Sequence, residues 1–121
     1  MRQLPPLRGQ IWHVWTPGQP HDPHQPRRAL VISDDERNVY SDDVTVIPVF
    51  SHGRAGPTHV SIPKGRWGLD HDSVLFCEEI TTLHFDFLAE GPLGTLVPDG
   101  VLQRVVRAVR IGLGDVVFPG A

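Results

Sequence analysis

Residues 26–35 read PRRALVISDD, so Arg27 and Arg28 stand directly before the apolar, β-prone run 29–32. A guanidinium group is costly to bury alone, and a pair of them at a strand entrance therefore indicates a carboxylate partner or an anionic ligand. Two interpretations stay open from these residues alone. The arginines either pair with an intramolecular acid beside a solvated strand start, or they form part of a binding site for an anion.

Outward from this stretch, short runs of β-branched and aromatic residues alternate with turns rich in Gly and Pro. We expect strands in residues 9–15, 29–33, 44–50, 57–62, 72–80 and 93–96. A charged turn is expected over residues 34–38 and a short helical turn over 83–88. Pro48 cannot donate a hydrogen bond to a neighbouring strand, so it is expected at a sheet edge or a bulge.

From Asp99 onward the hydrophobic period changes from that of strands to that of a helix. The apolar side chains at helical spacing are Leu102, Val105, Val106, Val109 and Leu113. Pro98 and Asp99 are a start signal, and Gly112 and Gly114 a stop signal. Five or six short strands followed by one amphipathic helix predict a mainly β fold with a C-terminal α-helix, built as a small antiparallel barrel.

The chain has 121 residues, which suits one domain over residues 1–121. Its formal charge of −3 excludes a strongly basic nucleic-acid binder but allows a local basic patch. The single cysteine, Cys77, lies in an apolar run, so we expect a packed thiol rather than a nucleophile. No apolar run approaches the roughly 20 residues of a membrane span, and the first residues lack the apolar core of a signal peptide. The expected location is the cytoplasm.

Residues 16–27, TPGQPHDPHQPR, bring His21, Asp22 and His24 close together in sequence. No third or fourth ligand stands at a recognisable spacing, so we predict no metal site and no other cofactor. A loop placed directly before Arg27 is expected instead to cover a ligand.

The order of these pieces resembles the MazF/PemK family of toxin endoribonucleases over residues 9–112. Residues 8–12 (RGQIW) are similar to the opening strand of the family, and residues 27–35 (RRALVISDD) to its "RP-x-LV" strand. Residues 46–48, 57–60 and 68–74 follow in the same order. The resemblance implies an SH3-like antiparallel barrel, a homodimer, and the toxin component of a type II toxin–antitoxin system. It also implies metal-independent, sequence-specific cleavage of single-stranded RNA (mRNA) and neutralisation by a cognate antitoxin.

Carried over by position, the functional arginine of the family falls on Arg27, which would clamp the scissile phosphate and stabilise its developing charge. Arg28 takes the place of a proline. Phe50 stands where the family has a threonine, and Ser51, one place on, is the candidate for the missing hydroxyl. His52 is the candidate for an acid or a base.

Further residues are expected to bind RNA: Arg28, His21, His24, Arg54 and Glu79. Glu79 begins the run EITT, where the family often has QIRT, and this change alters either RNA binding or internal ion pairing. An acidic antitoxin tail would find its contacts at Arg27, Arg28 and Arg54. The apolar face of the C-terminal helix is expected to pack on its own barrel or to lie near the dimer seam.

Two other functions remain open. Phe50 in place of threonine favours a catalytically degenerate toxin fold that binds an antitoxin or another partner. The same barrel also serves the related CcdB group, so a gyrase-directed toxin is the third possibility.

Overall fold

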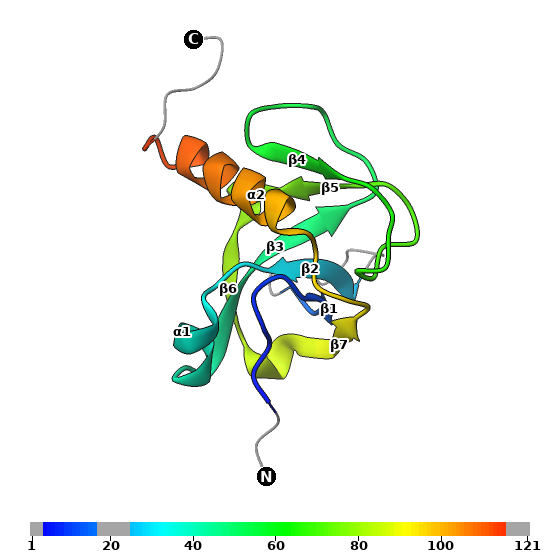
Figure 1. Ribbon diagram of the computed structural model, residues 1–121. Helices are drawn as coiled ribbons and strands as arrows, with labels where there is room; N and C mark the ends of the chain where they lie inside the picture. Colours follow the sequence, from blue (N-terminus) through cyan, green and yellow to red (C-terminus); the bar gives the residue numbers. More distant parts are fainter. Residues whose placement is uncertain (1–3, 17–24, 116–121) are drawn as a thin grey trace.

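The computed structural model describes residues 4–16 and 25–115, and it shows a curved antiparallel sheet with a helix packed across one face (Figure 1). The strands are β1 (Ile11–Val14), β2 (Arg27–Val31), β3 (Asp43–Phe50), β4 (His59–Ile62), β5 (Ser73–Phe76), β6 (Thr81–His84) and β7 (Leu88–Leu93). The helices are α1 (Asp35–Val39) and α2 (Asp99–Gly112), with single 3-10 turns at η1 (Cys77–Glu79) and η2 (Phe85–Phe87). The predicted fold class is confirmed.

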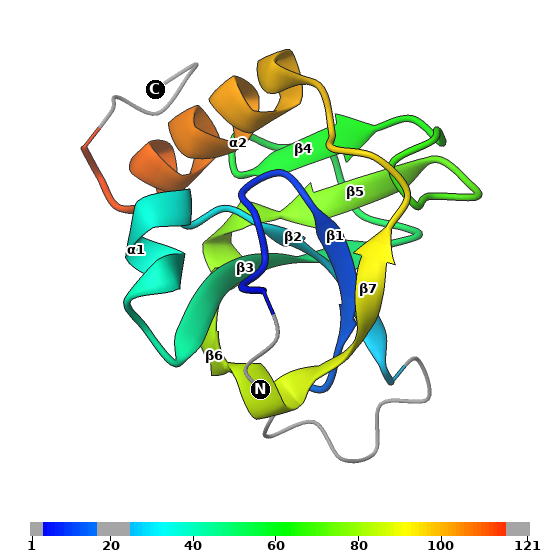
Figure 2. The same ribbon diagram turned by 60° about the horizontal axis from the view of Figure 1, so that its bottom comes forward.

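The sheet is organised around β3. The strand order is β4-β5-β3-β2-β1-β7, and β6 pairs with the first half of β3 while β5 pairs with its end. Figure 2 shows β1, β2, β3, β6 and β7 curling around a ring, as in an SH3-like barrel. Among the described strands no pairing joins β6 to β7, so the barrel is left open where η2 connects these two strands.

β2 and β3 are buried on both faces, which explains why their apolar runs do not alternate with polar residues. Leu30 and Ile47 point to the cluster that α2 covers, and Val31 and Val46 to the cluster inside the curl. Arg27, the first residue of β2, lies outside both clusters and is only half-buried.

The bounds of α2 agree with the sequence prediction, but part of its predicted apolar stripe is wrong. The buried side chains are Val101, Leu102, Val105, Ala108 and Ile111. Val106 and Leu113 are instead 38% and 75% exposed. The helix packs on β4 and η1 of its own sheet, and this contact selects a stripe offset from the predicted one.

Three other expectations for secondary structure are corrected. Residues 81–84 form β6 because they pair with β3, and only η2 in the expected helical turn 83–88 is helical. The last strand ends at Leu93 instead of covering 93–96, and β5 ends at Phe76 instead of reaching residue 80. The charged turn 34–38 is a short helix, because the Asp34 carboxylate accepts hydrogen bonds from the backbone N–H groups of Glu36 and Arg37.

Pro48 does not lie at a sheet edge, which was one of the two positions expected for it. It is in the central strand β3 and opposite Ala29 of β2. On the other side of β3, Val46 is the last residue paired with β6 and Val49 the first paired with β5. The missing donor therefore falls at the point where the neighbour of β3 on that side changes from β6 to β5.

Cys77 is confirmed as a packed thiol. It is 1% exposed, and burial, followed by the nearby charge of Glu78, raises its pKa to about 12. The thiol is therefore protonated at neutral pH and is not a nucleophile. No helix in the described part of the chain is long and apolar enough to cross a membrane.

Candidate functional site

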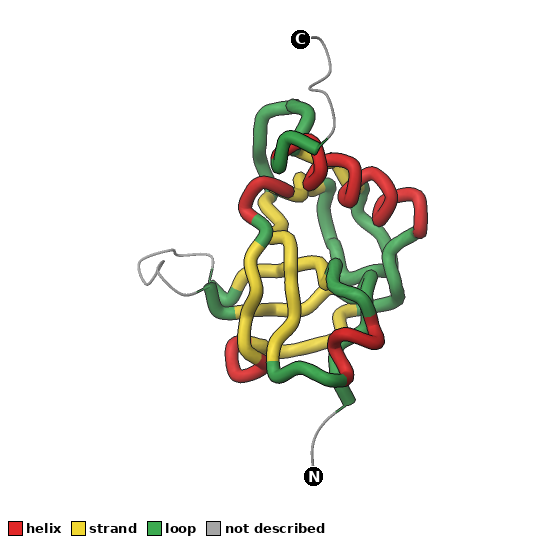
Figure 3. The backbone as a smooth tube through the Cα atoms, turned by 90° about the vertical axis from the view of Figure 1, so that its left-hand side faces the viewer, coloured by secondary structure: helices red, strands yellow, loops and turns green. Residues whose placement is uncertain are grey.

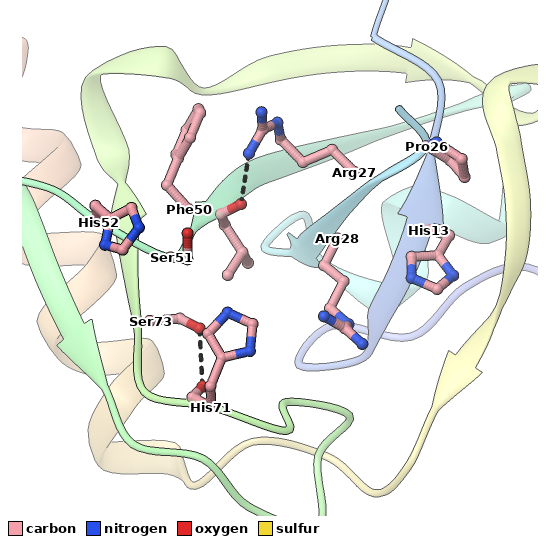
Figure 4. Close-up of a pocket in the computed structure, with 10 residues that line it drawn as sticks. His13, Pro26, Arg27, Arg28, Phe50, Ser51, His52, His71 and Ser73 are labelled. Atoms are coloured by element: carbon pink, nitrogen blue, oxygen red, sulfur yellow. Dashed lines mark hydrogen bonds between the residues drawn. The ribbon is translucent and has the colours of Figure 1, made fainter. Parts of the chain in front are cut away.

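A pocket of about 300 Å³ opens at the edge of the sheet where β2 begins and β3 ends (Figure 4). Its lining residues are His13, Pro26, Arg27, Arg28, Val49, Phe50, Ser51, His52, His71 and Ser73. They come from four separate parts of the chain. Two guanidinium and three imidazole groups therefore face one hollow, which is a favourable setting for a phosphate group.

Strand register places Arg27 against Phe50. Ala29 lies opposite Pro48 in the β2–β3 pair, and the same register continued by two residues brings Arg27 opposite Phe50. The guanidinium carbon of Arg27 lies 4.0 Å from the centre of the Phe50 ring, and Nη1 donates a hydrogen bond of 3.1 Å to the Val49 carbonyl. The guanidinium group is thus held by a ring face and a backbone oxygen.

Phe50 belongs to a longer stacked row that crosses four neighbouring strands. Its ring centre lies 4.3 Å from that of Phe76 on β5, and the Phe76 ring lies 4.2 Å from that of His59 on β4, with 7° between the planes. The stacked row, Arg27–Phe50–Phe76–His59, follows the strand order β2-β3-β5-β4. The Phe50 ring contacts both the Arg27 guanidinium group and the Phe76 ring, so it is a support within the fold.

The His59 end of the stacked row is fixed by two acceptors. Nδ1 lies 2.6 Å from the Arg54 carbonyl and Nε2 lies 2.7 Å from Glu78 Oε1. The hydrogen bond to the Arg54 carbonyl, followed by that to Glu78, raises the pKa of His59. Burial raises the pKa of Glu78 most strongly, but the hydrogen bonds from His59, the backbone and Thr58, together with the charge of His59, outweigh it, and the pKa of Glu78 is lowered. The pair is therefore a protonated imidazole bonded to a carboxylate.

Arg28 has an intramolecular acid as its partner. Its Nη1 lies 3.4 Å from Asp70 Oδ1, and the same oxygen lies 2.7 Å from Nδ1 of His71. The hydrogen bond from His71, followed by the charge of Arg28, lowers the pKa of Asp70. His13 of β1 lies directly opposite Arg28 in the strand pair, and its Nδ1 is 3.7 Å from Glu90 Oε2.

Ser51 and His52 follow directly after β3 and are exposed at the mouth of the pocket. They also line a second hollow of about 620 Å³, which runs between residues 51–53 and residues 61–63. Ser73 borders both hollows. The two hollows share Ser51, His52 and Ser73 and therefore adjoin; together they are called the groove below.

The structure brings four of the predicted site residues into the pocket: Arg27, Arg28, Ser51 and His52. Arg54 is exposed on the loop beyond it, and Glu79 is exposed on η1; neither lines the pocket. His21 and His24 lie outside the described residues. Within residues 4–16 and 25–115, no three His, Cys, Asp or Glu side chains are grouped as metal ligands.

Two lining histidines were not predicted as site residues. His13 falls within the strand expected over residues 9–15, and pairing with β2 sets it opposite Arg28. His71 lies in the polar run DHDS, whose only local signal is an acid on each side. Their position beside the arginines follows from strand pairing and from the fold of the loop 63–72.

A family model described as PemK-like, MazF-like toxin of type II toxin–antitoxin system matches residues 7–113. The chain belongs to this toxin family. The match spans every described element from β1 to α2 and confirms the resemblance inferred from the sequence. The Endoribonuclease MazF of Staphylococcus saprophyticus is 36% identical over 90 residues, which are 73% of this chain and 73% of the relative.

Solved structures of toxins from this family have the same fold. An endoribonuclease in complex with its cognate antitoxin, from a mycobacterial species, superimposes with a TM-score of 0.74 at 24% identity and covers 94% of this chain and 99% of its own. MazF from Deinococcus radiodurans gives a TM-score of 0.74 at 23% identity, with 93% and 99% covered. The antiparallel sheet with its C-terminal helix, seen from another side in Figure 3, therefore matches the architecture of these toxins.

Proposed function

We propose that this toxin is an endoribonuclease that cleaves single-stranded RNA, including mRNA, at short specific sequences without a metal ion, and that it acts in the cytoplasm. The observation that carries the proposal is the pocket itself. Arg27 and Arg28 lie there together with His52 and Ser51, at the end of a groove. A related chain, the MazF of S. saprophyticus, is an endoribonuclease by name.

RNA supplies its own nucleophile, because the 2′-hydroxyl group can attack the adjacent phosphorus. The reaction then needs a base for this hydroxyl, an acid for the leaving 5′ oxygen, and donors for the charged phosphorane. The planar guanidinium group of Arg27 suits the phosphate oxygens. Ser51 and His52 lie at the mouth of the same pocket, where a hydroxyl donor and an acid are required.

The groove supports a polymer rather than a small molecule as substrate. The pocket beside Arg27 holds the scissile phosphate, and the hollow along Ser61 and Pro63 takes the neighbouring nucleotides. Arg54 and Glu79 are left to contact RNA beyond the two hollows. His21 and His24 lie outside the described residues, and their place in the sequence shortly before Arg27 assigns them to the same RNA.

Phe50 is compatible with cleavage in this arrangement. The residue in place of threonine supports the guanidinium group of Arg27 through its ring face. Ser51 follows it at the mouth of the pocket and takes over the hydroxyl function. Binding of a partner without RNA cleavage remains the second candidate function, because the threonine itself is missing.

The proposed partners are a cognate antitoxin and a second copy of the chain. The mycobacterial relative is described in complex with its cognate antitoxin. For this chain, an acidic antitoxin segment would bind the cations Arg27, Arg28 and Arg54 and thereby block the RNA groove. Light scattering after size-exclusion chromatography measures the homodimer directly.

Incubation of the purified toxin with a long RNA in EDTA tests the activity. We expect fragments that end in 2′,3′-cyclic phosphate and begin with a 5′-hydroxyl, and sequencing of the 5′ ends should return one short motif. Arg27→Ala should lower the rate by at least about 10²-fold, as for the loss of one donor to a developing oxyanion. Arg110→Ala, at an exposed arginine of α2 that pairs with Asp115, is the matched control.

Circular dichroism shows whether each variant is folded. Full cleavage by a folded Arg27→Ala variant would contradict the assignment of Arg27 as the residue that binds the scissile phosphate. Intact RNA combined with tight binding of the antitoxin would support the partner-binding function instead.

A further inference from the structure

We propose that His71 is the general base of the pocket and that Asp70 and Arg28 hold it in place. The inference rests on the proposed RNA cleavage and names a catalytic group that neither the sequence pattern nor the family position of Arg27 indicates. It is carried by a chain of three contacting side chains that ends in the pocket: Arg28, Asp70 and His71.

The bond to Asp70 sets the tautomer of His71. An ionised carboxylate only accepts hydrogen bonds, so at a distance of 2.7 Å the proton on the ring must be at Nδ1. In the neutral ring this tautomer leaves a lone pair on Nε2, the form that a base requires. Figure 4 shows the ring of His71 projecting into the pocket from the loop below, toward the space bordered by Ser51 and Arg28. The side chain is half exposed, and a substrate can reach it.

The loop that carries His71 is held on both sides of this residue. The hydroxyl of the buried Ser73 donates a hydrogen bond of 3.0 Å to the His71 carbonyl. The Asp72 carboxylate accepts one of 3.0 Å from the backbone N–H of Lys64. Leu69, two residues before His71, is 3% exposed and belongs to the hydrophobic core. A base fixed in this way loses little conformational entropy when the substrate binds.

Arg28 completes the arrangement from the side of the sheet. Its Nη1 lies 3.4 Å from Asp70 Oδ1, which ties the loop to β2. Its positive charge also offsets the Asp70 carboxylate, which would otherwise repel a phosphate bound at the neighbouring Arg27. Arg28, which holds the base through Asp70, is therefore the neighbour on β2 of Arg27, which binds the phosphate.

The reaction is balanced as follows. Nε2 of His71 takes the proton of the 2′-hydroxyl while the O2′–P bond forms, and Arg27 binds the charged oxygens of the phosphorane. The P–O5′ bond then breaks, and the 5′ oxygen takes a proton from the protonated imidazole of His52. The products are a 2′,3′-cyclic phosphate and a 5′-hydroxyl. Proton exchange with water restores both imidazoles.

The test uses the full chain and an RNA whose cleavage site has been mapped with the unchanged toxin. His71→Gln should lower kcat by about 10²-fold or more, within the usual range for a general base. The affinity for the same RNA with a 2′-deoxy group at the cleavage site should stay within about twofold, since it is bound but cannot be cut. Asp70→Asn should cause a smaller loss of kcat.

The control is a second His–Asp pair of equal exposure. His84 of β6 is 51% exposed, close to the 50% of His71, and its Nδ1 lies 3.4 Å from Asp86, but it does not line the pocket. His84→Gln should leave kcat unchanged. Unchanged kcat in His71→Gln, with His84→Gln as reference, would overturn the proposal while leaving the RNA cleavage itself intact. No cleavage by the unchanged toxin would overturn both.

A substrate with sulfur in place of the bridging 5′ oxygen distinguishes the role of a general base from that of a general acid. Its leaving group is a thiolate, which departs without taking a proton, so cleavage of this substrate needs no acid. His71→Gln should impair cleavage of this substrate as strongly as that of ordinary RNA, whereas His52→Gln should impair only the latter. If the cleavage rate of His71→Gln were restored on the sulfur substrate, His71 would be the general acid, which would contradict its proposed role as the base.

The pH profile of kcat/KM provides an independent readout. Asp70 is bonded to the His71 ring, and the other titratable and charged residues that line the same pocket are Arg27, Arg28, His13 and His52. The limb of the profile that rises with pH should disappear in His71→Gln and shift in Asp70→Asn. An unchanged rising limb in both variants would count against the proposal.

Discussion

The guanidinium carbon of Arg27 lies 4.0 Å from the centre of the Phe50 ring, across two neighbouring strands. Phe50, for which the sequence comparison by position predicts a threonine in the family, contacts the residue on which RNA cleavage is proposed to depend. Behind it, Phe76 and His59 continue the stacked row to β4. The position of the arginine in this toxin is therefore set by aromatic packing across four strands.

Removal of the Phe50 ring should weaken catalysis without unfolding the protein. A cation–π contact contributes about 0.5–2 kcal/mol, and Phe50→Leu should therefore lower kcat by about 2- to 30-fold. Steady-state cleavage of a defined RNA measures the effect. Phe87→Leu, at a more exposed phenylalanine of η2 outside the pocket, is the control. If kcat of Phe50→Leu equals that of the control, the ring does not position Arg27.

The His59–Glu78 pair should make stability depend on pH in a defined direction. Because the pKa of His59 is raised in the folded state, its contribution is fully present below the ordinary value near 6.5 and is lost as pH rises through the folded-state pKa. Because the pKa of Glu78 is lowered, its contribution is present above the ordinary carboxyl range and is lost in acid. The pair is partly exposed, so the effect should stay below about 1 kcal/mol.

Urea unfolding at pH 6 and pH 9 measures this difference. His59→Gln should be less stable than the unchanged toxin at pH 6, and the gap should narrow at pH 9. Glu78→Gln should show part of the same dependence, since the Arg54 carbonyl still accepts a hydrogen bond from His59. A gap that widens toward pH 9 would contradict the assigned direction of the His59 pKa.

Gly94 should not tolerate a side chain. It has a φ of +68°, and a Cβ atom there would lie 1.9 Å from the carbonyl oxygen of Arg66. Gly94→Ala should destabilise the protein by more than about 1 kcal/mol and displace the loop that carries His71, with a matching loss of kcat.

Gly100, in the first turn of α2, has nothing within 4 Å of the same added atom. Gly100→Ala should therefore stabilise by about 0.4–1 kcal/mol and leave kcat unchanged. Thermal unfolding of both variants makes the comparison. Equal stability of the two would show that the contact between Gly94 and Arg66 is not tight.

The core should respond most strongly at Leu75, which is 0% exposed at the centre of the cluster under α2. Leu75→Ala should cost about 2–5 kcal/mol, the usual range for a buried leucine. Leu113→Ala removes the same atoms from a side chain that is 75% exposed, and it should change the stability by less than about 0.5 kcal/mol. Urea midpoints of the two variants measure the difference, and similar midpoints would contradict this description of the core.

Much of the fold can be predicted from local patterns. The strand that begins at Arg27, the long strand β3 and the helix α2 were all predicted, since apolar period and turn residues are properties of neighbouring positions. The prediction is wrong where contact with a segment distant in the sequence determines the secondary structure or the buried face. Residues 81–84 become a strand only because β3 lies beside them, and the buried stripe of α2 is chosen by β4 and η1.

The features of the candidate site also fall into those that local sequence predicts and those that depend on distant segments. The sequence by itself determined the fold class, the place of Arg27 at the entrance of a strand, and the polar corner Ser51–His52 after β3. Only the tertiary structure decided that Phe50 supports Arg27, that Arg28 pairs with Asp70, and that His71 enters the pocket. The physical reason is that these contacts join segments far apart in the chain. Strand register and the packing of the loop 63–72 bring them together, and no local pattern specifies either.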